Sequence, residues 1–154
     1  MDVKFLPMDE SLLSVTELRT LVSEAVISAA DFFSAGADMC SDDLRRDLLL
    51  RLKGHLQDYV LIRVRGELAG VYCFYGDGAS MTIYDLYIIP EYRCRGLATK
   101  AVERCISSTE QPIFVQLYNA DRFSISLFKR MGFRREKELS VSLSRWLYDN
   151  CDPF

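Results

Sequence analysis

Two arginines and a glycine separate an apolar run from an amphipathic run, in a spacing suited to phosphate binding. Residues 84–100 are predicted to pass from a strand through a tight loop into a helix, with Arg93, Arg95 and Gly96 in the loop. N–H groups in the first turn of a helix lack partners, and the helix dipole adds about half a positive charge there. The segment therefore predicts a site for a phosphorylated cofactor.

An acid inside the same apolar strand is the second candidate for chemistry. Asp85 interrupts a run in which charged residues are uncommon. Strand alternation predicts that Asp85 shares a face with Ile83 and Tyr87 and lies opposite Leu86 and Ile88. The carboxylate is either a general base or the partner in a cross-strand hydrogen bond or salt bridge, for instance to an arginine.

Hydrophobic periodicity in the first half predicts the elements that lead up to this strand. Predicted helices and strands are a strand over 3–7, a helix over 11–33 ended by Gly36, and a second helix begun by Ser41 as N-cap. The second helix is expected to bury one leucine face: Leu44, Leu48, Leu49, Leu52 and Leu56. Residues 59–65 and 68–75 predict a hairpin about Gly66-Glu67, followed by a third strand over 81–89.

The second half predicts alternating helices and strands. They are a helix over 97–107, a strand over 112–118, a helix over 123–131 ended by Gly132, and a strand over 133–146. In the last strand Leu139, Val141 and Leu143 alternate with serines. The whole order predicts an α+β fold with a mixed central sheet, in which a three-stranded antiparallel meander follows two helices.

Size and charge limit the classes of function. The 154 residues predict one domain over 1–154, and the net charge of -3 argues against nonspecific nucleic-acid binding. Since the chain has neither a membrane-length apolar run nor a secretory signal pattern, we expect a cytoplasmic protein without a membrane partner. Five cysteines without a CxxC pair predict reduced thiols, and with one histidine, His55, no metal site is expected.

Three pieces of the chain resemble the GNAT superfamily, the acyl-CoA-dependent N-acetyltransferases. The first is Pro90 followed by Arg93-Cys-Arg-Gly-Leu-Ala98, which is similar to the family's pyrophosphate loop. The second is the hairpin residues Glu67-Leu-Ala-Gly-Val71, and the third is Ser124-Ile-Ser-Leu-Phe-Lys-Arg-Met-Gly-Phe133. The resemblance implies a GNAT fold and acetyl-CoA as co-substrate, with no metal.

The resemblance also implies roles for individual residues. Three residues, Leu86, Tyr87 and Ile88, are expected to pair through their backbone with the pantetheine arm of the cofactor. The pyrophosphate is expected to contact Arg93, Cys94, Arg95, Gly96, Leu97, Ala98 and Thr99, mainly through N–H groups. Asn119 and Ser124 are expected beside the pantetheine arm, and the Ile88 N–H is expected to hold the developing oxyanion.

The chain departs from the family pattern at several of these positions. Asp121 stands where the family often has asparagine, so Asn119 is expected to make that contact and Asp121 to cap the short helix. Phe128 replaces a tyrosine that in many members protonates the thiolate of CoA, so water, Tyr118 or Tyr84 is left for that role. Gln116 replaces a glutamate base of some members. Cys94 is interpreted as a filler residue.

The resemblance implies direct transfer of an acetyl group from acetyl-CoA to a primary amine of a small molecule or peptide, with Asp85 as the leading candidate for the base. The alternative is a GNAT-fold domain that binds CoA or a partner with little or no catalysis. The two N-terminal helices, their loop and the last strand are expected to form the acceptor pocket. The last strand and the aromatic tail from Trp146 to Phe154 suggest a homodimer contact.

Overall fold

The structure is a computed structural model that describes residues 1–8, 18, 20–23 and 41–149. The predicted helix over 11–33 falls mostly outside these residues, and so does the tail after Asp149. Two of its predicted apolar positions, Leu18 and Val22, are described and are fully buried. They pack in the same cluster as Leu48 and Leu52, so this part of the chain contributes to the core.

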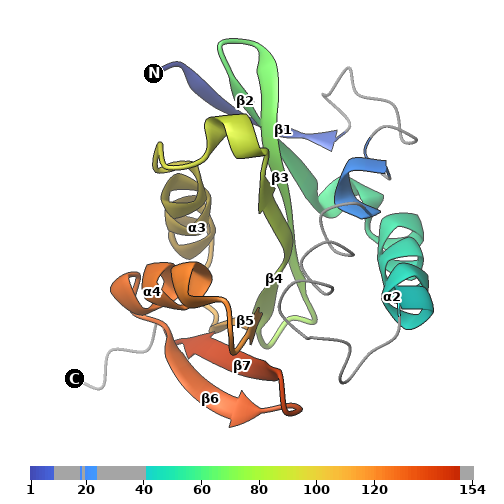
Figure 1. The fold of residues 1–154 in the computed structure, drawn as a ribbon, viewed down its shortest axis with the longest axis vertical. Coiled ribbons are helices and arrows are strands. Elements are labelled where there is room, and N and C mark those ends of the chain that lie inside the picture. Colours follow the sequence, from blue (N-terminus) through green and yellow to red (C-terminus); the bar gives the residue numbers. More distant parts are fainter. Residues whose placement is uncertain (9–17, 19, 24–40, 150–154) are drawn as a thin grey trace.

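Seven strands form one mixed sheet in the order β1-β2-β3-β4-β5-β7-β6 (Figure 1). Their bounds are β1 Val3–Pro7, β2 Tyr59–Val64, β3 Glu67–Gly76, β4 Met81–Ile88, β5 Ile113–Tyr118, β6 Arg134–Glu138 and β7 Leu143–Tyr148. Every neighbouring pair is antiparallel except β4 with β5, which is parallel because α3 makes the crossover between them. The predicted α+β class, with its antiparallel meander, is confirmed.

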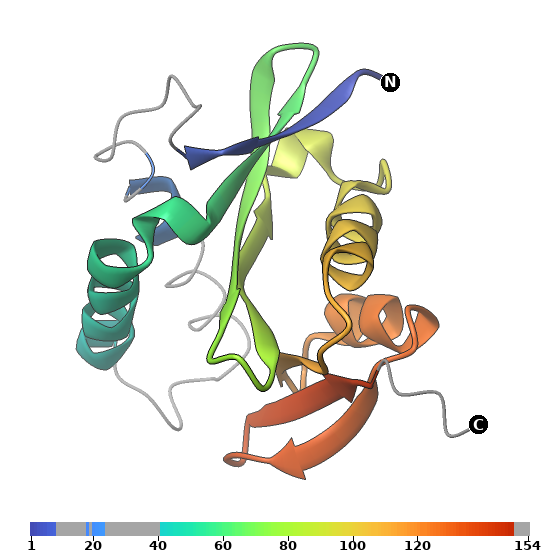
Figure 2. The same ribbon diagram turned by 180° about the vertical axis from the view of Figure 1, so that it is seen from behind.

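Helices cover both faces of this sheet. Figure 1 shows α3 (Leu97–Ser108) and α4 (Arg122–Arg130) on one face and α2 (Ser41–Gly54) on the other, and Figure 2 shows the same arrangement from behind. Each face has its own core. Residues of α3 and α4 pack with the sheet in one cluster, and α2 packs with β2 and β3 in a second.

The leucine face of α2 is narrower than its sequence predicts. Leu48 is fully buried and Leu52 is 6% exposed, as expected for residues four apart on one side of a helix. Leu49 was predicted on this face, but it is 38% exposed. The prediction is wrong because one residue turns the helix by 100°, which carries Leu49 toward the edge of the buried stripe.

The hairpin turn between β2 and β3 lies one residue earlier than predicted. The turn residues are Arg65 and Gly66, whose φ angles are 53° and 83°, and Glu67 is already in β3. Two left-handed residues in a two-residue turn match the right-handed twist of the strands they connect. Glycine adopts this backbone readily, and Arg65 adopts it because the strand register requires a second left-handed residue.

The region predicted as one strand over 133–146 is a hairpin of two strands. β6 and β7 are antiparallel neighbours, and the connecting residues include Val141, which is 81% exposed. The last strand lies between β5 and β6 in the sheet, and Trp146 is only 5% exposed. The predicted last strand also includes β6, which is an edge strand of the sheet and is exposed along its whole length, so the expected homodimer contact stays a prediction. Gly132, with a φ of 98°, ends the helix before this hairpin as predicted.

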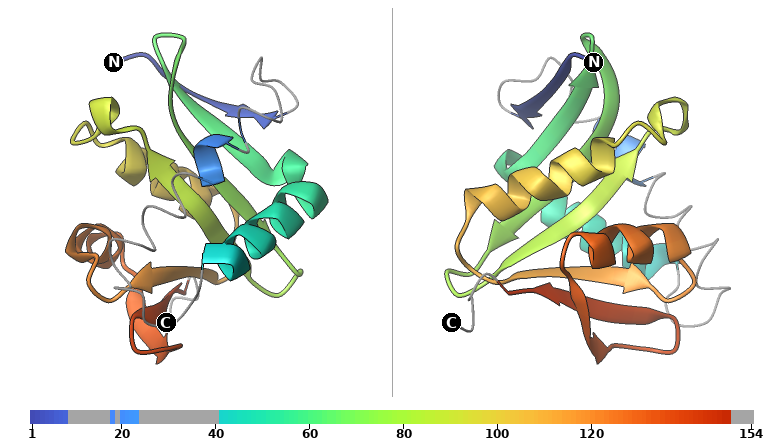
Figure 3. Two further views of the ribbon diagram at one scale, coloured as in Figure 1. Left: turned by 45° about the vertical axis from the view of Figure 1, so that its right-hand side comes forward. Right: turned by 90° about the vertical axis from the view of Figure 1, so that its left-hand side faces the viewer.

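The parallel pair β4–β5 is short, and this opens the sheet. Pairing extends only from Met81 to Ile83 on β4, opposite Ile113 to Val115 on β5. Beyond Ile83 the strand β4 continues to Ile88 but pairs only with β3. The two strands diverge from their common start in the right-hand view of Figure 3. Within the part of the chain that the structure describes, one edge of β4 therefore has no neighbouring strand along its second half.

A β-bulge at Asp85 changes the alternation along this strand. Tyr84 pairs with Cys73 and Tyr87 pairs with Val71, so two residues of β4 lie opposite one of β3. Asp85 has a φ of 56°, which is left-handed and rare for a residue with a side chain. The bulge places Asp85 and Tyr84 both on the α2 face, so the predicted shared face with Ile83 is wrong. The shared face with Tyr87 is correct.

Candidate active site

The unpaired edge of β4 is the first part of the candidate site. The Ile89 N–H donates to Ala69 O on β3 at 2.8 Å. Because successive residues of a strand point to opposite edges, the N–H and carbonyl of Ile88 point to the edge that β5 has left. The Ile88 carbonyl accepts a hydrogen bond from Arg93 Nε at 2.9 Å. A guanidinium from the following loop therefore lies at this edge.

A glycine on the neighbouring strand lets β3 come close to this part of β4. A Cβ on Gly70 would lie 2.6 Å from the Tyr87 carbonyl oxygen and 2.9 Å from Ile88 Cδ1. Real side chains do not approach so closely, so the strand needs a residue without Cβ here. This explains the glycine in the hairpin piece that resembles the GNAT superfamily.

The loop after β4 leads into a helix start with free N–H groups. Gly96 precedes α3 in a left-handed conformation, with φ of 78°, and a Cβ there would meet no atom within 4 Å. The first bond of the helix joins Lys100 N to Gly96 O at 3.0 Å. The N–H groups of Leu97, Ala98 and Thr99 precede it and have no acceptor within the helix. They are available to an anion.

Two arginine side chains of the loop stack on nearby aromatic rings. Arg93 lies over the ring of Tyr87, with its Cζ atom 5.4 Å from the ring centroid, and Arg95 lies over Tyr92 at the same distance. Cys94 is exposed and left-handed, with φ of 63°. Both guanidinium groups remain near solvent, where they add positive charge to that of the helix dipole.

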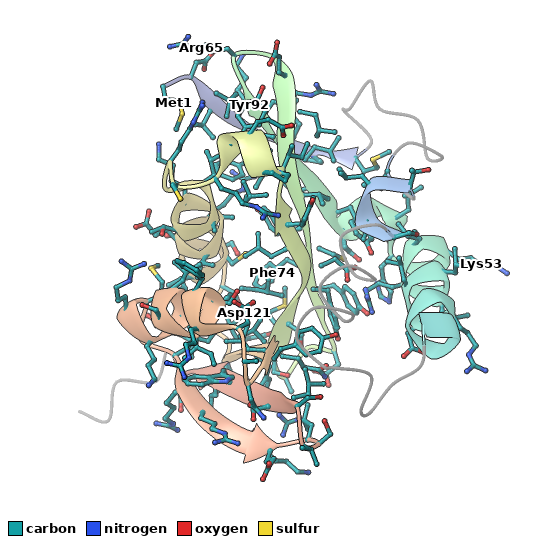
Figure 4. The ribbon with its side chains drawn as sticks, in the orientation of Figure 1. Met1, Lys53, Arg65, Phe74, Tyr92 and Asp121 are labelled. Carbon is teal, nitrogen blue, oxygen red and sulfur yellow. The ribbon has the colours of Figure 1, made fainter. Side chains whose placement is uncertain are left out.

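The start of α4 is capped by an acid. Asp121 accepts hydrogen bonds from the Ser124 N–H at 3.1 Å and from the Ser124 hydroxyl at 2.6 Å. The predicted capping role of Asp121 is confirmed, and Figure 4 shows Asp121 at this end of the helix. The Ser124 hydroxyl uses its proton in the cap, so toward a ligand it can act only as an acceptor.

Asn119 binds the hairpin β6–β7 through both ends of its amide. Its Nδ2 donates to Val141 O at 3.1 Å, and its Oδ1 accepts from the Ser144 hydroxyl at 2.6 Å. Ser144 is fully buried and also accepts from Arg135 Nε at 3.1 Å. Asn119 therefore fixes the end of β5 to the hairpin, and its expected contact with a cofactor stays a prediction.

Asp85 makes three hydrogen bonds on the α2 face of the bulge. Arg51 donates from Nε to Oδ2 at 2.9 Å and from Nη2 to Oδ1 at 2.8 Å, and the Tyr59 hydroxyl donates to Oδ2 at 2.6 Å. The side chain of Asp85 is 5% exposed and that of Arg51 is 16% exposed. The salt-bridge role that the sequence left open for Asp85 is thus present.

The charges in this cluster shift the pKa values of its members. Burial lowers the pKa of Arg51, but the hydrogen bond and negative charge of Asp85 more than offset this, so the net shift is upward. Burial and then the charge of Asp85 raise the pKa of Tyr59. Arg51 is therefore a fixed cation and Tyr59 a fixed donor at neutral pH.

Aromatic rings extend from the cluster along the α2 face. Arg51 lies over the Tyr84 ring at 4.7 Å, Tyr84 stacks on Tyr75 at 4.8 Å, and Tyr75 stacks on His55 at 3.6 Å. Burial and a hydrogen bond to Tyr84 raise the pKa of Tyr75 to about 12. Tyr75 pairs with Thr82, which precedes Ile88 by six residues on β4. Tyr75 and the His55 ring that stacks on it therefore lie about 20 Å from Ile88 along the strand. His55 is too distant to act as a base at Ile88.

The position of the family's acidic tyrosine lies in the core. Phe128 is 2% exposed and packs edge-to-face on Phe133, with ring centroids 4.9 Å apart. Of the phenols considered in its place, Tyr118 is half-buried, and burial raises its pKa. Gln116 is exposed on β5. A proton donor for a leaving thiolate is therefore not provided at position 128.

Other features lie apart from this edge. Two open hollows of about 570 and 560 Å³ flank α4, and neither is lined by β4 or the loop after it. The first is lined by α4, β6 and β7 and the second by α4, and both include Asn119, Ile125 and Lys129. Among the described residues, no three His, Cys, Asp or Glu side chains gather closely enough to hold a metal ion.

None of the helices in the described part of the chain is long and apolar enough to span a membrane.

The sequence profile of the Acetyltransferase (GNAT) family matches residues 24–133, which include the open strand edge, the left-handed loop and the start of α4. The chain belongs to the GNAT acetyltransferase family. The family membership supports the GNAT fold and the assignment of the protein as an acyltransferase, and both agree with what the resemblance implied. The family uses acetyl-CoA. No curated protein sequence matches the chain significantly.

Solved structures of GNAT proteins share the fold along almost the whole chain. An acetyltransferase from Thermus thermophilus is 18% identical with a TM-score of 0.67, covering 96% of this chain and 97% of its own. The PaiA N-acetyltransferase of Thermoplasma acidophilum, in complex with coenzyme A, is 15% identical with a TM-score of 0.63, covering 97% and 99%. The ribosomal-protein-S18-alanine N-acetyltransferase of Escherichia coli is 12% identical with a TM-score of 0.64, covering 95% and 92%.

Two partners of the site were not predicted from the sequence. Arg51 lies on α2 and Tyr59 begins β2, and neither stands near Asp85 along the chain. The sequence pointed to an arginine as a partner for Asp85 without distinguishing Arg51 from the other arginines. The sequence signal that was present is a tyrosine at the start of an apolar strand: Tyr59 is fully buried, and the hydroxyl of a tyrosine in a core needs a partner.

Proposed function

We propose that this GNAT protein transfers an acetyl group from acetyl-CoA directly to a primary amine of a small molecule or a peptide. The observation that carries the proposal is the continuity of the open β4 edge with the free helix start. The Ile88 backbone faces the edge left by β5, and the N–H groups of Leu97, Ala98 and Thr99 follow a few residues later. This order suits a ligand with an amide-bearing arm joined to a pyrophosphate.

The residues present fit such a cofactor. Ile88 and, by alternation, Leu86 offer strand backbone to the pantetheine amides, and the loop from Arg93 to Thr99 offers N–H groups to the pyrophosphate. The expected pairing of Tyr87 is not supported, because its carbonyl faces Gly70 of β3. Gly96 supports the fit because the space that a Cβ would occupy is free of atoms within 4 Å. Phosphate oxygens can therefore reach the backbone there. We place Ser124 beside the pantetheine arm as a hydrogen-bond acceptor. We place Asn119 there as well, because each end of its amide can make one hydrogen bond more than its contacts with the hairpin use.

The chain supplies electrostatic help rather than covalent chemistry in this proposal. The Ile88 N–H donates to the thioester carbonyl oxygen as negative charge develops there. The neutral amine nitrogen attacks the carbonyl carbon, the C–S bond breaks with its electron pair leaving on the CoA sulfur, and the nitrogen releases one proton to water to give the amide. A thiol has a pKa near 8.5, so the thiolate can leave without a proton donor, and a phenylalanine at position 128 is compatible with turnover. Cys94 takes no part.

The acceptor is expected on the α2 face, opposite the helices α3 and α4. Tyr84, Tyr87 and Asp85 of β4 lie on that face, together with Arg51 from α2. The E. coli neighbour acts on the alanine of ribosomal protein S18, as its name states, but at 12% identity it supports only the fold. Both small amines and peptide amines belong in a substrate screen.

A calorimetric titration with acetyl-CoA followed by a CoA-release assay tests the proposal. Saturable one-to-one binding in roughly the micromolar range is expected, followed by release of free thiol with at least one amine of a broad panel. Absence of binding by folded protein would contradict the cofactor placement. Binding without thiol release from any amine would instead favour a domain that binds CoA without catalysis.

A further inference from the structure

The cluster of Arg51, Asp85 and Tyr59 is the most constrained polar group on the α2 face. Three donors hold one carboxylate, from Arg51 Nε, Arg51 Nη2 and the Tyr59 hydroxyl, at 2.9, 2.8 and 2.6 Å. The donors come from α2 and β2, so the contacts join a helix and a strand on the far side of β3 to the middle of β4. Paired guanidinium–carboxylate hydrogen bonds fix orientation as well as distance.

The carboxylate belongs to the residue that makes the bulge. Asp85 adopts a φ of 56°, which costs free energy for any residue with a Cβ and persists only where its surroundings enforce it. Its side chain accepts hydrogen bonds from two other elements of the fold. The bulge in turn sets the direction of the next residues, because it shifts the pairing with β3 between Val71 and Cys73.

We infer that Asp85, held by Arg51 and Tyr59, is a positioning residue that fixes the β4 bulge and thereby aims the Ile88 N–H, and that it is not the base that deprotonates the amine. The inference rests on the proposed function, since the backbone it positions is the one assigned to acetyl-CoA. The sequence allowed two roles for Asp85, a general base or the partner in a cross-strand hydrogen bond or salt bridge. The inference selects the second role.

The surroundings of the carboxylate argue against proton uptake from the amine. Among the described residues, Cys73 of β3 also interacts with the carboxylate: burial and then the charge of Asp85 raise the pKa of this thiol, and the charge of Arg51 partly opposes them. The two carboxylate oxygens already accept three hydrogen bonds, two from Arg51 and one from the Tyr59 hydroxyl. With 5% of its side chain exposed, Asp85 offers little surface to an acceptor.

One consequence concerns the acceptor. If the protein supplies no carboxylate base, the amine must lose its proton to water before it attacks. At pH 7 about a tenth of an α-amino group with a pKa near 8 is neutral, but only about one part in 2,500 of a lysine-type amine with a pKa near 10.4. The difference is about 250-fold in reactive amine. We expect amines of low pKa to be the better substrates, and kcat/KM to follow the pKa of the amine.

A second-site rescue separates positioning from base catalysis. Asp85→Asn is expected to lower kcat at least tenfold, because it leaves the cation of Arg51 without its charge partner. The double variant Asp85→Asn with Arg51→Gln replaces the ion pair by two neutral amides and should recover at least threefold of that loss. Lys53→Gln is the matched control, since this exposed cation of α2 points away from the sheet in Figure 4. It should leave kcat unchanged.

If Asp85 were the base, the double variant would be as slow as Asp85→Asn, and Arg51→Gln alone would stay near the wild type. That pair of results would overturn the inference. Tyr59→Phe remains informative if Asp85→Asn does not fold, because it removes one hydroxyl and no charge. Positioning predicts a lower kcat at every pH with an unchanged pH profile. A base that lost a donor would move the acid limb of the profile to higher pH, which would also overturn the inference.

Hydrogen exchange gives a readout that does not need turnover. The amides of residues 84–88 should exchange at least threefold faster in Arg51→Gln and Tyr59→Phe than in Lys53→Gln, because the bulge loosens. Equal exchange in all three variants would refute the anchor even in a protein that acetylated nothing. Wild-type protein that binds acetyl-CoA but releases no thiol would contradict the proposed function instead, so the two failures are distinguishable.

Discussion

Replacing Gly96 by glutamate tests the position of the pyrophosphate most directly. Gly96 has a φ of 78°, and a Cβ at this residue would enter space with no atom within 4 Å. The folded protein can therefore hold the new side chain at the cost of backbone strain alone, roughly 1–2 kcal/mol for a residue with a Cβ in the left-handed region. The carboxylate would stand among the N–H groups proposed for the phosphates.

The expected loss of affinity follows from charge repulsion. A carboxylate about 5 Å from one phosphate charge is disfavoured by about 3.3 kcal/mol at an effective dielectric constant of 20, and by about 1.7 kcal/mol at 40. The loop is exposed and screened by salt, so the lower figure is included. These energies correspond to roughly a twenty- to two-hundredfold weaker binding of CoA.

Calorimetric titration with CoA measures the effect, with Gly78→Glu as the matched control. Gly78 is also left-handed, with φ of 94° and no atom within 4 Å of an added Cβ, but it lies in the turn between β3 and β4. The control carries the same charge and a similar strain, and should bind CoA like the wild type. Unchanged affinity in folded Gly96→Glu protein would refute the placement, and equal losses in both variants would assign the effect to the fold.

Three further predictions concern stability. Burial raises the pKa of Cys105 from about 9 to about 12, so the unfolded chain releases this proton first as pH rises, and stability falls from pH 9 upward. Between pH 8 and 10 this thiol should lower the free energy of unfolding by about 1.4 kcal/mol. The effect is measurable because Cys105→Ala should show a smaller pH slope of the unfolding free energy than the wild type. Asp121→Ala should cost about 1 kcal/mol by removing the α4 cap at the Ser124 N–H. Leu48→Ala should cost about 2–5 kcal/mol, whereas Leu50→Ala, at a residue 62% exposed, should stay within about 0.5 kcal/mol.

Urea unfolding measures all three. An equal pH slope in wild type and Cys105→Ala would show that the thiol titrates alike in both states. For the cap, Arg122→Ala in the first turn of α4 is the control, since it leaves Asp121 bonded. A loss in Asp121→Ala no larger than in this control would contradict the capping energy. Comparable losses in the two leucine variants would contradict the placement of α2 against the sheet.

The local elements and the phosphate loop were predictable because their causes lie close together in the chain. A strand that ends at Pro90, a left-handed glycine and an amphipathic run specify a strand, a tight loop and a helix without reference to the rest of the molecule. The cap of α4 is equally local, since Asp121 and Ser124 are three residues apart. The strand, the loop, the helix and the cap were confirmed, whereas phosphate binding by the loop stays a prediction.

The errors arose where distant segments decide the outcome. The one-residue shift of the β2–β3 turn follows from the register of two paired strands, and the division of residues 133–146 into two strands follows from their pairing with β5 and with each other. Period-two alternation of Leu139 and Val141 describes a strand equally well whether or not a partner exists. Only the pairing shows that these two residues lie in a connection.

By itself, the sequence determined the α+β class, the family resemblance and the strand–loop–helix segment proposed to face a phosphorylated cofactor, because each depends on residues within one helical turn or strand of one another. Tertiary structure alone decided what Asp85 does. Arg51 is 34 residues from Asp85 and Tyr59 is 26 residues away, so their hydrogen bonds exist only after α2, β2 and β4 have packed. The left-handed bulge that these contacts surround carries no mark in the sequence, since its conformation is set by partners rather than by the residue itself.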